Sequence, residues 1–312
     1  VEAFCRVLEE PEFYSLSAGI VLQAYLPDSH EIQKKLTHWA KNRVQNGGAP
    51  IKIRIVKGAN LAMEQFEASV KGWPQAPYPS KVEVDANYKR MVLYGCIPEN
   101  ARCVHLGIAS HNLFDIAFAM LLRLENQVQS YTVFEMLEGM ADHIRRVVQR
   151  LTGDMLLYCP VATASEFQHA IAYLIRRLDE NTGPENFLRH VFGLRPGTES
   201  WDTQTAIFSQ SCDDIQSASS EPRRGQNRLL EPAPLDTHAP FENEADTDFS
   251  LPQNRDWALG IIENAKKNRP DPIPLVIGGE EIYPNQDGVG YDPSHPVKPL
   301  YMYAKANKQH IE

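Results

Sequence analysis

The sequence has few cysteines, and their arrangement suggests neither a disulfide framework nor a metal site. The 312 residues include five: Cys5, Cys96, Cys103, Cys159 and Cys212. This number is odd and the spacing is wide. No pair forms a C-x-x-C motif or stands with histidines at the spacing of zinc ligands. We therefore expect reduced thiols, mostly buried, and no bound metal.

Long apolar runs and an excess of positive charge are also missing. One of the longest apolar runs, 116–122, is far shorter than the roughly 20 residues of a membrane helix, and the chain does not open like a signal peptide. Lys and Arg number 31 against 40 Asp and Glu, which gives a net charge of −9. An acidic chain offers no general surface for a phosphate backbone. These absences predict a cytoplasmic protein that does not bind nucleic acid.

Short apolar runs alternate with helical patterns over residues 18 to about 180. We predict strands at 18–24, 51–59, 103–109, 128–134 and 155–159. We predict helices at 28–44, 61–71, 112–124 and 165–178, and one more helix that follows the fourth strand and ends at 149. This alternation is typical of a parallel sheet covered by helices. Neither G-x-G-x-x-G nor G-x-x-x-x-G-K-[ST] follows any predicted strand, so the pattern favours part of an eight-unit barrel over an open doubly wound sheet.

The composition changes after about residue 205. The next residues are rich in Ser, Asp, Glu and Pro and have no sustained apolar period, which predicts a linker at 206–240. Residues 241–312 have too little apolar content for a core of their own. Because residues 1–10 already show a helical pattern without a cap, we expect the chain to be a fragment of a longer protein.

Arg54 is the first candidate for a functional residue. In IKIRIV (51–56) the isoleucines occupy one face, and Lys52 and Arg54 the other. An unpaired buried charge costs several kcal/mol, so a guanidinium inside a barrel needs an anionic partner. Two interpretations stay open. Arg54 pairs with a carboxylate of a neighbouring strand, or it points at an electron-accepting cofactor.

The helix predicted at 165–178 carries a polar face opposite its apolar stripe. Tyr173, Arg176, Arg177 and Glu180 lie together on that face. Helix geometry alone favours a solvated face with an Arg176–Glu180 ion pair, and the alternative is two arginines that bind a small carboxylate. His111 and Tyr158, at strand ends, are open to a structural or a catalytic interpretation.

Several segments together resemble a known family. They are GIVLQAY (19–25), RIVKGAN (54–60), ASHN (109–112), FEMLEGMA (134–141), LYCPVA (157–162) and AYLIRRLDEN (172–181). In this order they resemble the proline dehydrogenases of the bifunctional proline utilisation A family over about residues 1–205. Segments 241–258 and 274–282 are similar to the start of the aldehyde dehydrogenase domain of that family. The resemblance implies that residues 241–312 form the N-terminal beginning of this domain.

The resemblance implies an α/β fold that forms about strands 4 to 8 of a distorted (β/α)8 barrel, with FAD as cofactor and L-proline as substrate. It implies cofactor contacts from Gln23, Arg54, Val56, Gly58, Ala59, Ala109, His111, Asn112 and Glu135. It implies that Arg54 is catalytic, near the flavin N5, and that substrate contacts come from Arg176, Arg177, Tyr158, Tyr173, Glu180 and Leu137. Two departures from the family are Asn60-Leu61, where better-known members have Tyr-Trp, and Glu135, where they have Gln.

The implied reaction is FAD-dependent oxidation of L-proline to 1-pyrroline-5-carboxylate, with electrons passing to a quinone at the membrane. NAD-dependent oxidation of glutamate semialdehyde to glutamate would follow in a longer parent protein that can form oligomers, while the isolated chain would be inactive. Two alternatives remain. One is a Schiff-base barrel lyase that uses Lys52 or Lys57, and the other is an inactive fragment with only an interaction role.

Overall fold

The computed structural model describes residues 1–231, 238, 240–268, 271–284 and 287–312. Within these ranges the chain forms two compact units, Val1–Arg224 and Gly225–Glu312. In the described ranges, no helix combines the length and the apolar character that are needed to cross a membrane.

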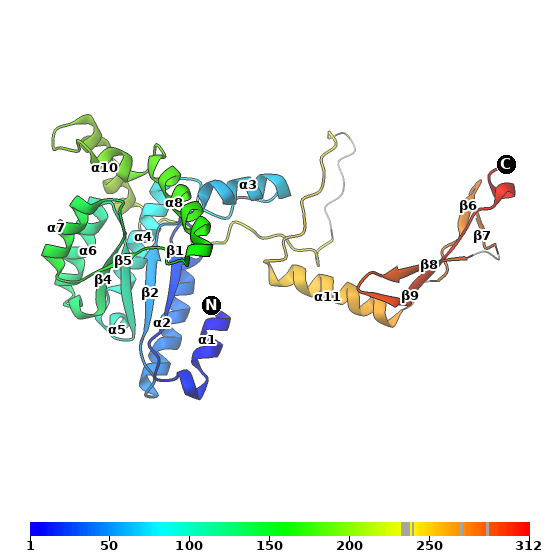
Figure 1. Cartoon of the computed structure of the whole chain (residues 1–312), viewed down its shortest axis with the longest axis horizontal. Helices are drawn as coiled ribbons and strands as arrows, with labels where there is room; N and C mark the ends of the chain where they lie inside the picture. Colours follow the sequence, from blue (N-terminus) through cyan, green and yellow to red (C-terminus); the bar gives the residue numbers. More distant parts are fainter. Residues whose placement is uncertain (232–237, 239, 269–270, 285–286) are drawn as a thin grey trace. The chain divides into compact units, whose positions relative to one another are not determined.

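The first unit is built on one parallel sheet (Figure 1). Its strands are β1 (Gly19–Gln23), β2 (Ile51–Val56), β3 (Val104–Ala109), β4 (Thr132–Leu137) and β5 (Met155–Tyr158). They pair in chain order, so β1 and β5 are the edges. The predicted α/β fold with five parallel strands is thereby confirmed. The fourth strand begins later than the sequence pattern predicted, because residues Gln129–Tyr131 form a 3-10 turn before it.

Helices precede, connect and follow these strands. They are α1 (Glu2–Leu8), α2 (Ser29–Gln45), α3 (Leu61–Lys71), α4 (Lys81–Gly95), α5 (Pro98–Ala101), α6 (Leu113–Glu125), α7 (Asp142–Thr152), α8 (Phe167–Thr182), α9 (Phe187–Val191) and α10 (Glu199–Asp213). Helices α2 and α4 pack against β1, β2 and β3, and α7 packs beside β5. Every strand after β1 therefore follows a crossover helix, as parallel pairing requires.

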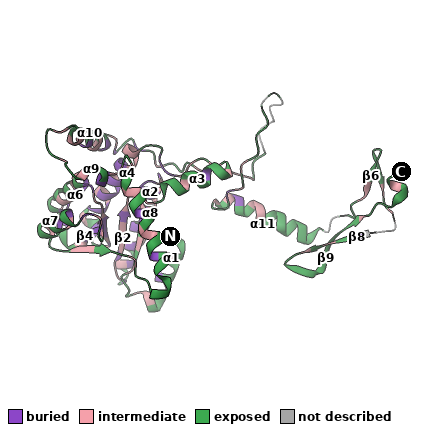
Figure 2. Cartoon of the chain, turned by 45° about the horizontal axis from the view of Figure 1, so that its top comes forward, coloured by how far each residue is buried: buried purple, intermediate pink, exposed green. Residues whose placement is uncertain are grey.

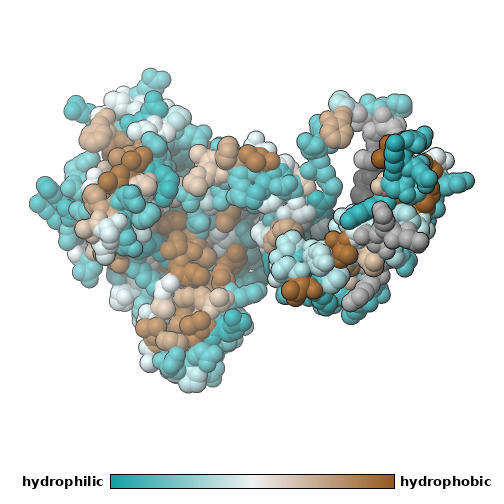
Figure 3. Space-filling view, turned by 45° about the vertical axis from the view of Figure 1, so that its right-hand side comes forward, coloured by the Kyte–Doolittle hydropathy of each residue, from teal (hydrophilic) through white to brown (hydrophobic). Residues whose placement is uncertain are grey.

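The core lies between the sheet and these helices (Figure 2). Ile51, Ile53 and Ile55 are fully buried there, whereas Lys52 and Arg54 on the opposite face of β2 keep some exposure. This alternation confirms the predicted orientation of β2. Several large apolar side chains nevertheless stay exposed, and apolar surface gathers in the middle of one face of this unit (Figure 3).

Helices α4 and α10 had no counterpart in the predicted elements. Ser80 caps α4 by accepting a hydrogen bond from the backbone N–H of Glu83. The two helices pack together, and the fully buried Lys89 Nζ donates to Ser211 Oγ of α10 at 2.7 Å. Helix α10 thus includes residues 206–213, the first part of the expected linker, whereas residues 232–237 and 239 of that linker lie outside the described ranges.

The second unit consists of one helix and two small antiparallel sheets. Its elements are α11 (Pro252–Lys267), β6 (Leu275–Ile277), β7 (Glu280–Ile282), β8 (Asp287–Asp292) and β9 (His295–Ala304). In the β8–β9 pair, Gly288 and Gly290 lie directly under the rings of Tyr303 and Tyr301, where any side chain would clash.

Candidate functional site

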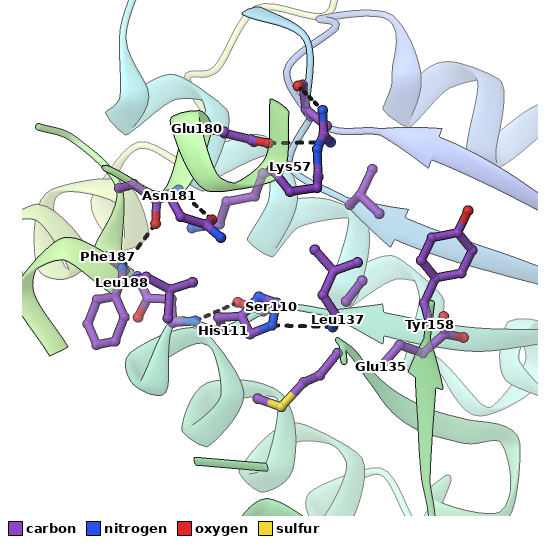
Figure 4. A pocket seen from close by; sticks show the side chains of 18 of the residues that line it. Lys57, Ser110, His111, Glu135, Leu137, Tyr158, Glu180, Asn181, Phe187 and Leu188 are labelled. Carbon is purple, nitrogen blue, oxygen red and sulfur yellow. Dashed lines mark hydrogen bonds and ion pairs between the residues drawn. The ribbon is translucent and has the colours of Figure 1, made fainter. Parts of the chain in front are cut away.

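A pocket of about 380 Å³ lies at the carboxyl ends of the parallel strands in the first unit. Ligand sites of parallel α/β proteins occur at this end. Figure 4 shows side chains from the strand ends and from α8 converging on one space. The predicted site residues that line it are Arg54, Val56, Gly58, Ala59, Ala109, His111, Asn112, Glu135, Leu137, Tyr158, Tyr173, Arg177 and Glu180.

Helix α8 turns part of its polar face toward this pocket. Tyr173, Arg177 and Glu180 line it, whereas Phe167 and Leu178 of the apolar stripe are more than half exposed. The polar residues turn inward because acceptors for a guanidinium lie there. The solvated-face interpretation of these three residues is therefore wrong.

Arg177 is the most firmly held residue of this face. Its side chain is 9% exposed and donates through Nη2 to the backbone oxygen of Ala59 at 2.8 Å and to Oδ1 of Asn60 at 3.3 Å. Its Nη1 lies 3.3 Å from Oε2 of Glu180. Within the described residues, the buried Nε has no hydrogen-bond partner. A buried N–H of a cation that is left unpaired marks a place for an anionic acceptor.

The solvated-face interpretation paired Glu180 with Arg176. In the structure Glu180 pairs with the adjacent Arg177 instead. Burial raises the pKa of Glu180 to about 7, although the charge of Arg177 opposes this change. Arg176 is exposed, and in the described structure neither Arg176 nor Gln23 is among the residues that line the pocket. The backbone oxygen of Gln23 accepts a hydrogen bond from Ser29.

Arg54 meets a carboxylate, as one interpretation of the sequence required. Its Nε donates to Oε2 of Glu135 on β4, and Lys52 Nζ lies 2.6 Å from Oε1 of the same carboxylate. The Arg54 guanidinium also lies over the ring of Tyr158, 5.2 Å from its centroid. Because Arg54 still lines the pocket, the carboxylate pair and a role toward a ligand are compatible.

Lys57, just after β2, is the centre of a charge cluster that the sequence did not predict. Its Nζ lies 2.5 Å from Oδ1 of Asp85 and 2.6 Å from Oδ2 of Asp115. Burial alone would lower the pKa of Lys57, but Asp115 and Asp85 outweigh it and raise that pKa. Lys81 contacts Asp85 as well and lines the pocket with Lys57. Two lysines therefore line the pocket in addition to Arg54 and Arg177.

The signal for this cluster lay in the spacing of Lys81, Asp85 and Lys89. These residues recur at intervals of four and therefore share one side of α4. In the sequence this pattern looks like a charged face in solvent, but Asp85 and Lys89 are buried. An S-x-x-E start at Ser80 would have identified the helix itself.

His111 lines the pocket and is held by a backbone hydrogen bond. Its Nε2 accepts a hydrogen bond from the backbone N–H of Leu137 at 3.3 Å, and burial lowers the pKa of the ring. The ring is therefore neutral at physiological pH, with Nε2 unprotonated. Asn112 caps α6 by accepting from the N–H of Phe114. No cluster of potential metal ligands occurs in the part of the chain that the structure describes.

The fold and the pocket define a parallel α/β protein with a cationic, partly apolar site at the carboxyl ends of its strands. A comparison with known families matches residues 1–190 to the family described as Proline dehydrogenase. This match covers more than half of the chain. The chain belongs to the proline dehydrogenase family.

Solved structures agree with this assignment. Proline Utilization A from Corynebacterium freiburgense has 40% sequence identity and a TM-score of 0.69, over 83% of this chain and 24% of that one. Proline Utilization A from Bdellovibrio bacteriovorus, inactivated by N-propargylglycine, has 30% identity and a TM-score of 0.74, over 99% of this chain and 30% of that one. This chain thus spans less than a third of either protein.

A curated relative matches a shorter segment. The 1-pyrroline-5-carboxylate dehydrogenase of Oceanobacillus iheyensis is 36% identical over 73 residues, which are 23% of this chain and 14% of that protein.

Proposed function

We propose that the pocket binds FAD and L-proline and that the protein oxidises proline to 1-pyrroline-5-carboxylate. The observation that carries this proposal is Arg177, whose side chain lines the pocket and whose buried Nε is unpaired in the described structure. A carboxylate of a small substrate would satisfy that N–H. Tyr173 and Tyr158, whose rings are 6.1 Å apart, offer apolar faces for a five-membered ring.

The lining also suits a flavin. Val56, Ala59, Ala109 and Leu137 offer a flat apolar surface for the ring system, and Lys57 and Lys81 offer positive charge for the phosphates. When bound, a flavin supplies the two-electron acceptor for proline oxidation. Arg54 lies among these residues as a cation that favours negative charge on the reduced ring. Arg176 and Gln23 are proposed as further contacts that require a movement of α8 or of the β1 end.

We further propose that the five strands belong to a longer barrel and that residues 241–312 begin an aldehyde dehydrogenase domain, which would oxidise glutamate semialdehyde with NAD. The unpaired edges β1 and β5 support the first part. The match to a 1-pyrroline-5-carboxylate dehydrogenase supports the second. A quinone at a membrane surface is the proposed electron acceptor.

The test uses the full-length gene product that contains this chain. Chromatography of the released cofactor should identify FAD, and L-proline should support reduction of an artificial dye. Arg54→Met should retain most of the FAD and lower proline turnover by more than twofold. A protein that contains FAD but does not respond to proline would contradict the proposed substrate.

A further inference from the structure

We propose that Glu135 is a positioning residue that holds the Arg54 guanidinium and partly cancels its charge, so that it sets the reduction potential of the bound flavin. This inference rests on the proposed function. Glu135 is a carboxylate on β4, where a neutral side chain would be compatible with the same strand pairing.

The carboxylate is built into the sheet rather than attached at its surface. The Glu135 side chain is 2% exposed, and each of its two oxygens contacts a different cation of β2. It reaches them across β3 at Gly107, where an added Cβ would lie against Oε1 of Glu135. Gly107 therefore provides the space in which the carboxylate lies between Lys52 and Arg54.

The charges of this cluster sum to one positive unit, from two cations and one anion. Glu135 and Arg54 both line the pocket. Negative charge on a reduced flavin is stabilised by a nearby cation and destabilised by a nearby anion. Removal of the Glu135 charge should therefore favour reduction, and removal of the Lys52 charge should oppose it. Because Lys52 contacts the opposite oxygen, the two effects should compensate when both charges are removed.

Potentiometric titration of the flavin absorbance in the full-length gene product tests this inference. Glu135→Gln should raise the ratio of reduced to oxidised flavin at least tenfold at a fixed potential, a positive shift of about 30 mV or more for a two-electron couple. Lys52→Met should change the ratio in the opposite direction. The double variant should return to within about threefold of the wild type.

Glu138→Gln is the matched control, because Glu138 is an exposed glutamate three residues further along the same segment. It should leave the ratio within twofold of the wild type. If Glu135→Gln also stays within twofold, or shifts no more than Glu138→Gln, the inference is wrong. If Glu135→Gln does not fold, the Lys52→Met titration decides, and an unchanged ratio overturns the proposal. A wild type without flavin would contradict the proposed function itself, which is a separate result.

Discussion

The ammonium group of Lys57 lies 2.6 Å from Oδ2 of Asp115, at the start of α6, and this carboxylate also contacts the fully buried Lys89 at 3.2 Å. One aspartate at 1% exposure thus compensates two lysines from different elements. Through these contacts Asp115 of α6 is connected to Lys57 at the end of β2 and to Lys89 of α4.

Asp115→Asn should destabilise the protein by about 3 to 5 kcal/mol, because it removes the carboxylate that pairs with the buried Lys89 and leaves Lys57 with Asp85 alone. Denaturant unfolding measures this change. Lys34→Gln is the control, since Lys34 forms an exposed pair with Glu31, and it should cost less than about 1 kcal/mol. Equal effects of the two substitutions would show that the Asp115 cluster has no special role.

Lys57 should not act as a Schiff-base nucleophile. An amine must be unprotonated to attack a carbonyl group, and the carboxylates of Asp115 and Asp85 raise the pKa of Lys57. Borohydride treatment with a carbonyl compound, followed by peptide mass analysis, should detect no adduct at Lys57 at neutral pH. A stoichiometric adduct there would revive the lyase alternative.

Arg177→Met should raise the KM for proline roughly tenfold or more, because a charge-assisted hydrogen bond contributes about 1.5 kcal/mol or more. A proline analogue without the carboxylate should lose much less. Arg176→Met should raise the KM for proline by a smaller factor, since Arg176 is exposed in this structure. If both substrates lose equally in Arg177→Met, Arg177 is structural.

Glu180 should make the ligand-free protein less stable as pH rises. Burial raises the pKa of its carboxyl group from the ordinary 4.5 to about 7, so the folded state holds the proton more tightly than the unfolded state does. The resulting stabilisation is present below about pH 4.5 and is lost as pH rises toward 7. Glu180→Gln should remove this dependence, and melting temperatures of both proteins at pH 5 and pH 8 would reveal it. A parallel pH response of the two proteins would rule out this role.

The sequence predicted those parts of the fold in which apolar residues follow a regular period. The alternation in 51–56 predicted the buried isoleucines and the inward position of Arg54, and the period of 28–44 predicted α2. Helix α4 was missed because it is buried on more than one side and its buried residues include Asp85, Asn87 and Lys89, so a hydrophobic pattern cannot distinguish its buried positions from solvent-facing ones.

The family resemblance predicted most of the residues that line the pocket. It did not predict how deeply each side chain is buried or which groups it contacts. Thirteen of the predicted residues line one pocket, but no sequence pattern distinguishes Arg177 from its neighbour Arg176. That separation depends on how α8 is rotated against the sheet. It is fixed by acceptors on Ala59 and Asn60, which are distant along the chain.

Anaerobic titration of the purified full-length protein with L-proline is the most direct test of the central claim, that this pocket binds a flavin and proline together. The visible absorption of the bound flavin should bleach in a saturable manner with L-proline, and pyrrolidine at the same concentrations should have almost no effect. Flavin absorption that L-proline leaves unchanged, or that pyrrolidine bleaches equally well, would contradict the account.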